Sequence, residues 1–69
     1  MDKVVIKFGE RVRNLRKLAC LSIEELAFRS DLNRNYLSDV ERGKRNISLV
    51  AISKIAKGLN VPLDALFID

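Results

Sequence analysis

The sequence predicts a small all-α protein, a compact bundle of five short helices that makes up a single domain over residues 1–69. Hydrophobic residues make up 48% of the chain, whereas proline occurs once and glycine three times, a composition that favours a folded helical domain over a disordered one. The hydrophobic residues recur at the three- and four-residue spacing of one face of an α-helix. The chain is near the lower size at which a core supports folding without disulfides or metal.

The first helix is expected from about Ile6 to Leu18 or Ala19. Its inner face carries apolar residues at helical spacing, namely Phe8, Val12, Leu15 and Ala19. Residues 1–5 are expected to form a short N-terminal arm, apolar enough to pack either on the domain itself or on a second copy of the chain. Both alternatives fit the sequence.

A helix-turn-helix is predicted at about residues 23–41. Ser22 and Glu25 have the spacing of a capping box, in which the hydroxyl accepts from the backbone amide near the glutamate while the carboxylate reaches back. A second helix is therefore expected to start at Ile23. Asn33 is a good N-cap for a third helix, and two short helices joined by so tight a turn must cross steeply.

The outer face of the third helix is polar. With Leu37 and Val40 on the inner side, the residues that point outward are Asn35, Ser38, Asp39 and Arg42. Side chains of these types match base edges in a DNA major groove, and a basic cluster suited to phosphates follows, formed by Arg42, Lys44 and Arg45. An ordinary solvated helix face has a similar composition, so the face alone does not identify a function.

The last two helices follow Gly43, which is expected to end the third helix. Ser48 can cap a fourth helix, which either Gly58 or Asn60 is expected to end. The apolar positions of this helix are Leu49, Ile52, Ile55, Ala56 and Leu59. Pro62 suits the start of a final helix of one or two turns within residues 61–68.

Composition argues against catalysis. Cys20 is the only cysteine and histidine is absent, so an internal disulfide, a histidine-based catalytic site and a Cys/His metal site are all excluded. The three glycines stand too far apart for a phosphate-binding glycine loop. We therefore expect no enzyme, no metal and no cofactor.

Thirteen Lys and Arg against nine Asp and Glu give a net charge of +4, an excess that favours a polyanionic partner without identifying one. The N-terminus lacks the apolar core of a signal peptide, and no apolar run approaches the roughly 20 residues that span a bilayer. A lone cysteine fits a reducing compartment. The protein is therefore expected to be soluble and cytoplasmic.

Short motifs run in a fixed order through residues 8–67. They are Phe8-Gly9, Leu15-Arg16, Leu21-Ser22, Glu24-Glu25-Leu26-Ala27, Tyr36-Leu37-Ser38, Glu41-Arg42-Gly43, Ser48-Leu49, Ile55-Ala56, Leu59 and Leu66-Phe67. In this order they resemble the helix-turn-helix domain of the phage repressor and Cro family, also called the XRE family. The resemblance implies a lambda-repressor-like fold that binds double-stranded operator DNA as a homodimer, with the third helix in the major groove.

The resemblance also implies roles for individual residues. The base-contacting positions are Arg34, Asn35, Ser38 and Asp39. The phosphate-contacting positions are Ser22, Ile23, Tyr36, Arg42, Lys44, Arg45 and Asn46. Arg16 and Glu41 match positions that form a structural ion pair between the first and third helices.

Several of these roles have a specific chemistry. Arg34 can make a two-point contact to guanine, and Asn35 can do the same to adenine. Asp39 can accept from a cytosine amine or can instead hold an arginine in place. Tyr36 either presents its hydroxyl to a phosphate or packs at the edge of the core.

Three residues depart from the family pattern. Ile23 stands where the family usually has glutamine, which removes a side-chain contact to DNA but leaves backbone amides that can face a phosphate. Asp31 replaces the usual turn glycine, and Cys20 replaces the glycine after the first helix. Both residues must adopt a conformation that glycine enters more cheaply, although neither change is expected to abolish the fold.

The short chain, the stretch Arg34–Asp39 and the loop Glu41–Asn46 look most like the controller proteins of restriction-modification systems, which are small dimeric activator-repressors. We therefore expect a sequence-specific transcription regulator on a palindromic operator, with RNA polymerase as a further candidate partner and no membrane or small-molecule ligand. The alternatives are an antitoxin-type or phage-type repressor and a protein-interaction module that retains the fold.

The dimer surface is expected on the same helices, because the chain has no room for a separate oligomerisation domain. The candidates are Leu63, Leu66, Phe67 and Ile68. Filling the core of their own subunit is the alternative role for these residues.

Overall fold

The computed structural model describes residues 2–67, which form four α-helices and a 3-10 helix and contain no strand. The α-helices are α1 (Lys3–Leu18), α2 (Ile23–Arg29), α3 (Arg34–Glu41) and α4 (Leu49–Leu59), and the 3-10 helix η1 spans Leu63–Phe67. The predicted all-α bundle is thus confirmed, with a 3-10 helix as its fifth element. Within residues 2–67, no helix combines the length and the hydropathy needed to cross a membrane.

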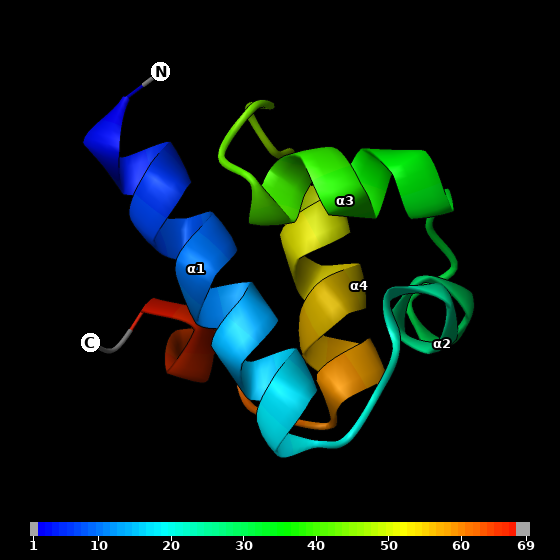
Figure 1. Ribbon diagram of the computed structural model, residues 1–69. Coiled ribbons are helices and arrows are strands. Elements are labelled where there is room, and N and C mark those ends of the chain that lie inside the picture. The colour runs from blue at the N-terminus through cyan, green and yellow to red at the C-terminus, as the bar shows by residue number, and fades with distance from the viewer. Residues whose placement is uncertain (1, 68–69) are drawn as a thin grey trace.

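Figure 1 shows α3 lying across one end of α4, with the C-terminal end of α3 against the middle of α1, while α2 lies beside α4 and η1 lies next to α1. A short turn connects α2 to α3, and α3 packs on α1 as well as on α2. The helix-turn-helix predicted at about residues 23–41 is therefore confirmed. One side of α3 faces the bundle and the other faces away from it.

The predicted N-terminal arm is wrong for residues 3–5, which form the first turn of α1, and Met1 lies outside the described residues. Asp2 is the N-cap of α1, and its carboxylate accepts a hydrogen bond of 3.1 Å from the amide of Val4. Aspartate at this position satisfies an amide that would otherwise lack a partner, so the helix begins earlier than its apolar pattern indicates.

The three predicted caps of the later helices are confirmed. Ser22 Oγ accepts from the amide of Glu25 at 3.0 Å, and the amide of Ser22 donates to the Glu25 carboxylate at 2.8 Å. Asn33 Oδ1 accepts from the first amides of α3, and Ser48 Oγ accepts from the amide of Ala51 at 3.1 Å. Each cap fixes where its helix starts, and the Asn33 cap thereby fixes where the turn between α2 and α3 ends.

The connections between helices use left-handed backbone conformations. Asp31 in the turn before α3 has φ of 53°, and Cys20 after α1 has φ of 60°. Asn60, with φ of 58°, ends α4, whereas Gly58 lies inside that helix. Of the two predicted ends of α4, the structure therefore selects Asn60.

The core draws fully buried side chains from every helix, namely Val12, Leu26, Leu37, Ile55 and Leu66. Two glycines allow helices to approach closely. A Cβ on Gly9 would overlap the carbonyl oxygen of Val40 in α3, and one on Gly58 would overlap Ser30 Oγ at the end of α2. Ser30 Oγ is itself buried without a hydrogen-bond partner among residues 2–67. These contacts leave α2 and α3 little freedom to shift on the bundle.

Candidate nucleic-acid interface

The outward side of α3 carries the four residues predicted to contact bases. We call this side the recognition face, and it consists of Arg34, Asn35, Ser38 and Asp39. Arg34 and Asn35 are exposed, whereas Ser38 and Asp39 are half-buried. The opposite side of α3 contributes Leu37 and Val40 to the core, where they are 0% and 1% exposed. The helix is thus fixed on one side and polar on the other.

The ion pair implied between Arg16 and Glu41 is present. Arg16 Nε and Nη2 donate to the two carboxylate oxygens of Glu41 at 2.8 and 3.1 Å, and Arg16 Nη1 donates to the carbonyl of Leu21 at 2.9 Å. The two side chains are 14% and 5% exposed, so this is a shielded, two-point contact. It fastens the last residue of α3 to α1 and to the chain just before α2.

Asp39 contacts Arg42, the C-cap residue of α3. Arg42 Nη2 donates to Asp39 Oδ1 at 3.0 Å. Of the two roles left open for Asp39 by the sequence, the structure therefore shows the one in which it holds an arginine. The pair also orients the guanidinium of Arg42 next to the recognition face.

Arg34 also has a carboxylate partner, which the sequence pattern did not indicate. Arg34 Nε donates to Glu24 Oε2 at 3.0 Å, although both side chains are more than half exposed. The pKa of the Glu24 carboxyl is lowered, first by a backbone hydrogen bond at Glu24 and then by the hydrogen bond from Arg34. Glu24 is in the first turn of α2 and Arg34 is in the first turn of α3, so only the helix-turn-helix brings them together.

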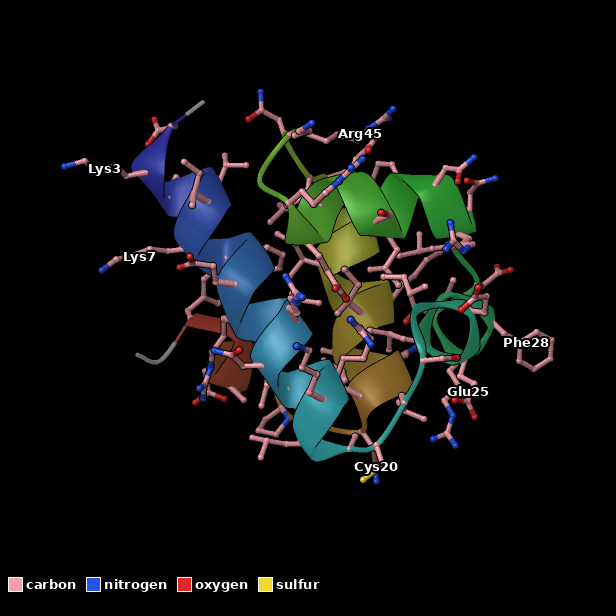
Figure 2. The ribbon with its side chains drawn as sticks, in the orientation of Figure 1. Lys3, Lys7, Cys20, Glu25, Phe28 and Arg45 are labelled. Atoms are coloured by element: carbon pink, nitrogen blue, oxygen red, sulfur yellow. The ribbon has the colours of Figure 1, made fainter. Side chains whose placement is uncertain are left out.

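A short loop with two cations follows α3. We call residues 43–46 the basic loop, in which Lys44, Arg45 and Asn46 are exposed. The guanidinium of Arg45 lies 4.8 Å from the centre of the Tyr36 ring, a cation–π contact that connects the loop to α3. Figure 2 shows Arg45 at the same end of the molecule as α3. Tyr36 packs against the edge of the core, which is one of the two roles expected for it.

The basic loop also lies against α1. Gly43 has φ of 70°, and a Cβ placed on it would come within 2.9 Å of Ile6 Cγ1 and 3.0 Å of Ile6 Cα. A side chain at this position would therefore meet both an unfavourable backbone conformation and a neighbouring helix. Gly43 allows the loop to pass directly over the early turns of α1.

The start of α2 offers less to a phosphate than the family resemblance implies. Ser22 already uses its amide as a donor and its hydroxyl oxygen as an acceptor in the capping box. The side chain of Ile23 packs against the core, so any phosphate contact from this residue depends on its backbone amide. Glu24 and Glu25 place two carboxylates in the first turn, where they compete with an anion for the positive end of the helix.

A hollow of about 240 Å³ lies where α1, the start of α2 and α3 meet. Its walls include three arginines and a serine of the recognition face, namely Arg13, Arg16, Arg42 and Ser38. Within residues 2–67, Arg13 has neither an ion pair nor a hydrogen bond through its side chain, unlike the other two arginines. Arg13 is therefore an available cation beside α3, and the sequence pattern did not indicate it as a contact residue.

A second hollow, of about 570 Å³, borders Tyr36 and Arg45 from the side of α4. Lys54 of α4 lies in its wall and approaches Asp31 at 3.7 Å. Among residues 2–67, no three His, Cys, Asp or Glu side chains are grouped as metal ligands. The cations that gather around α3, namely Arg13, Arg42, Lys44 and Arg45, are suited to binding a polyanion.

The structure divides the residues proposed for a dimer surface. Leu66 is 1% exposed and lies in the core of its own subunit, so the alternative role of core filling is correct for it. Leu63 and Phe67 are 52% and 58% exposed. Phe67 stacks on Phe8 with ring centres 5.5 Å apart, and Ile68 lies outside the described residues. Of the proposed surface residues that the structure describes, the accessible ones are therefore Leu63 and Phe67.

The fold and this interface define a class of protein. A family model described as Helix-turn-helix matches residues 12–66. Because the match covers most of the chain, the protein belongs to the helix-turn-helix family of XRE type.

Controller proteins of restriction-modification systems are among its relatives. Control protein C.MunI of a Mycoplasma species is 46% identical over 70 residues, covering 100% of this chain and 95% of that protein. The crystal structure of the controller protein C.AhdI from Aeromonas hydrophila superposes with a TM-score of 0.93 at 48% identity, covering 96% of this chain and 100% of that one. The controller protein C.Esp1396I, solved as a tetramer with its natural 35 base-pair operator, gives a TM-score of 0.91 at 30% identity over 97% of this chain and 88% of that one.

Proposed function

We propose that this protein is a sequence-specific transcription regulator that binds a palindromic operator as a homodimer, as a controller of a restriction-modification system. The recognition face carries this proposal. Its four polar side chains stand together on a helix whose other side is fixed in the core and whose end is fastened by Glu41 to Arg16. A helix held in this way can present the same side chains to each operator in the same geometry.

The residues of the recognition face differ in what they offer to DNA. Arg34 and Asn35 are exposed and can each make a two-point contact, to guanine and to adenine respectively. Ser38 is half-buried and can donate or accept over a short reach. Asp39 supports the proposal mainly through Arg42, which it orients. Specificity is therefore expected to come chiefly from the N-terminal half of α3.

The phosphate contacts are proposed from three places around α3. The basic loop contributes Lys44, Arg45 and Asn46, and Tyr36 contributes its hydroxyl. Arg42 lies at the end of α3, and Arg13 joins it as an additional cation in the hollow between α1 and α3. At the start of α2, the hydroxyl hydrogen of Ser22 and the backbone amide of Ile23 are the groups that can donate to a phosphate. Such contacts fix the register of the protein on DNA without reading sequence.

The proposed dimer uses the exposed apolar side chains of η1, Leu63 and Phe67, together with Ile68. A two-fold dimer places two copies of α3 on the two halves of a palindrome. Occupancy then depends steeply on protein concentration, and no effector is required. The tetramer of C.Esp1396I on its operator supports an assembly of more than one subunit.

The proposal involves no catalytic step, metal, cofactor or small-molecule ligand. It places the protein in the cytoplasm, where a bound operator would either block RNA polymerase or recruit it. The identity of 46% to a control protein over the whole chain supports the assignment to restriction-modification control. An endonuclease gene and a methyltransferase gene beside the coding sequence would support the same assignment independently.

Selection from a random pool of DNA duplexes tests the proposal. The wild-type protein should enrich a palindromic sequence, and its affinity should fall steeply with rising salt as phosphate contacts are screened. The double variant R34A/N35A is the control, because it keeps the fold and the basic loop but loses the exposed half of the recognition face. A wild-type selection without a common sequence would overturn the operator proposal and favour a protein-interaction module.

A further inference from the structure

We infer that Glu24 is a specificity-determining residue, which positions the guanidinium of Arg34 for a two-point contact to one guanine of the operator. The inference rests on the proposed function, because it assumes that Arg34 reads a base. It adds a residue from α2, which itself contacts no base, to the recognition of sequence. The carrying observation is the hydrogen bond of 3.0 Å from Arg34 Nε to Glu24 Oε2 across the helix-turn-helix.

The atom that makes this contact matters for DNA recognition. A guanidinium has a side edge formed by Nε and one terminal nitrogen, and an end formed by both terminal nitrogens. The carboxylate of Glu24 takes Nε, and the terminal nitrogens of Arg34 have no partner within residues 2–67. The end of the guanidinium therefore keeps two parallel donors, which match the O6 and N7 acceptors of guanine.

The position of the pair gives a second reason for this role. Arg34 is the first residue of α3, where the helix dipole repels a cation, so the arginine has no local reason to stay near the recognition face. Glu24 lies near the start of α2, where the same dipole favours its negative charge. A carboxylate held there restrains a long side chain that would otherwise sample many rotamers before binding.

The pair is exposed, with side chains 53% and 62% accessible, so it adds little to the folding stability of the domain. Its effect is expected in the orientation of Arg34. Removing Glu24 should therefore weaken the preference for guanine at one operator position, with only a small change in thermal stability. A merely structural residue would show the opposite pattern.

The experiment compares variants on the selected operator and on its three single-base changes at the position where R34A loses its preference. The wild-type protein should discriminate guanine from the other bases there by roughly 5- to 150-fold. E24A should reduce that discrimination by roughly 2- to 12-fold, the range expected when one long side chain is no longer restrained. E24Q keeps an oxygen that can accept from Nε, so its discrimination should fall between those of the wild type and E24A.

A matched control separates position from charge. E25Q also removes one negative charge from the first turn of α2, and glutamine keeps the capping box with Ser22. E24A and E25Q should therefore raise the affinity for random DNA alike, whereas only E24A should lower guanine discrimination. In the double variant E24A/R34A, loss of Glu24 should have no further effect on discrimination, because the side chain that it positions is absent.

The outcomes separate the positioning role of Glu24 from the proposed function on which it rests. If the wild type selects an operator but E24A and E25Q discriminate guanine equally well, Glu24 acts only as a charge and this inference is wrong. An increase in discrimination for E24A would show that Glu24 competes with the base, which also overturns it. If the wild type selects no sequence, the proposed function fails together with the inference.

Discussion

The recognition face and the basic loop carry their positive charges differently. Arg34 on the recognition face and Arg42 at its end each have a carboxylate at 3.0 Å, from Glu24 and Asp39. Lys44 and Arg45 in the basic loop have no carboxylate partner within residues 2–67, and Arg45 lies on an aromatic ring. A paired cation attracts a polyanion weakly at long range, whereas an unpaired one attracts it regardless of sequence. We infer that the basic loop contributes affinity for any DNA sequence and that the recognition face contributes sequence specificity.

Removing the Arg16–Glu41 ion pair, which holds the end of α3 from which the basic loop follows, should have the largest effect on stability. In E41A, the shielded guanidinium of Arg16 loses its carboxylate partner, which is expected to lower the free energy of unfolding by roughly 3–5 kcal/mol. Urea unfolding followed by circular dichroism measures this change. E10A, which removes an exposed carboxylate of α1, is the control and should stay within about 0.5 kcal/mol of the wild type. Equal stabilities of the two variants would contradict the anchoring role.

Breaking the proposed dimer should weaken the operator binding of both regions together. A monomer would bring only one recognition face and one basic loop to each operator. F67A is expected to sediment as a monomer at micromolar concentration and to bind the operator roughly 100-fold or more weakly. Phe28 of α2 is 87% exposed and distant in sequence from η1, so F28A is the matched control and should remain a dimer. Thermal melting checks that F67A is folded, since Phe67 also contacts Phe8. A dimeric F67A would move the interface elsewhere.

On the recognition face alone, N35A should lose roughly 1–3 kcal/mol of binding free energy on the selected operator and almost none on random DNA. The reason is that an amide contact to a base edge exists only on the correct sequence. Fluorescence anisotropy with both duplexes measures the difference. N14A removes an exposed asparagine of α1 and should leave both affinities unchanged. Equal losses on both duplexes would place Asn35 among the phosphate contacts.

In the basic loop alone, R45A should weaken binding to every sequence alike. Its salt dependence should become shallower by about 0.9 in log–log slope for each phosphate that the variant no longer neutralises. R29A removes an exposed arginine at the end of α2 and makes the same change in net charge, yet its slope should stay close to that of the wild type. A sequence-dependent weakening in R45A would mean that the loop reads bases and would remove the contrast between the two regions.

The smallest expected effect is that of pH on guanine discrimination. The Glu24 pKa is below its usual 4.5 because a backbone hydrogen bond and Arg34 stabilise the carboxylate. A pKa lowered by folding means that the ion pair is complete above the unfolded pKa and disappears as pH falls through the folded one. The chain has no histidine, so discrimination should be constant from about pH 5 to pH 8. Anisotropy across this range, with a carboxyl NMR titration of Glu24, checks the prediction.

The sequence predicted most of the fold because its signals are local. Ser22, Asn33 and Ser48 each satisfy amides within three residues, so spacing alone locates the starts of three helices. Apolar periodicity does not locate the start of the first helix, because Asp2 caps a turn that is largely exposed. The sequence pattern does not decide the role of Leu66, since an apolar residue near a chain end looks the same in a core and in an interface.

The polar outer side of α3 and the Arg16–Glu41 ion pair were predictable from the sequence, whereas the pairing of Arg34 with Glu24 was not. Helical periodicity places Asn35 on the outer side of α3, and the structure shows it exposed, whereas the place of Arg34 beside it was implied only by the family resemblance. Glu24 and Arg34 are ten residues apart, and nothing in their spacing indicates that they meet. Arg13 likewise reaches the edge of α3 only because Gly9 lets α1 approach Val40 closely. Such relations depend on how helices pack, which composition and periodicity do not encode.

The close approach of Gly43 to Ile6 affects how the basic loop enters a complex. A surface loop that becomes ordered only on binding costs conformational entropy at that step, roughly 1–2 kcal/mol for each residue fixed. Here the loop begins on the early turns of α1 and is also held by Arg45 on Tyr36, so part of that entropy is already given up when the domain folds. The N-terminal end of α1 thus preorganises the cations of the loop for their partner.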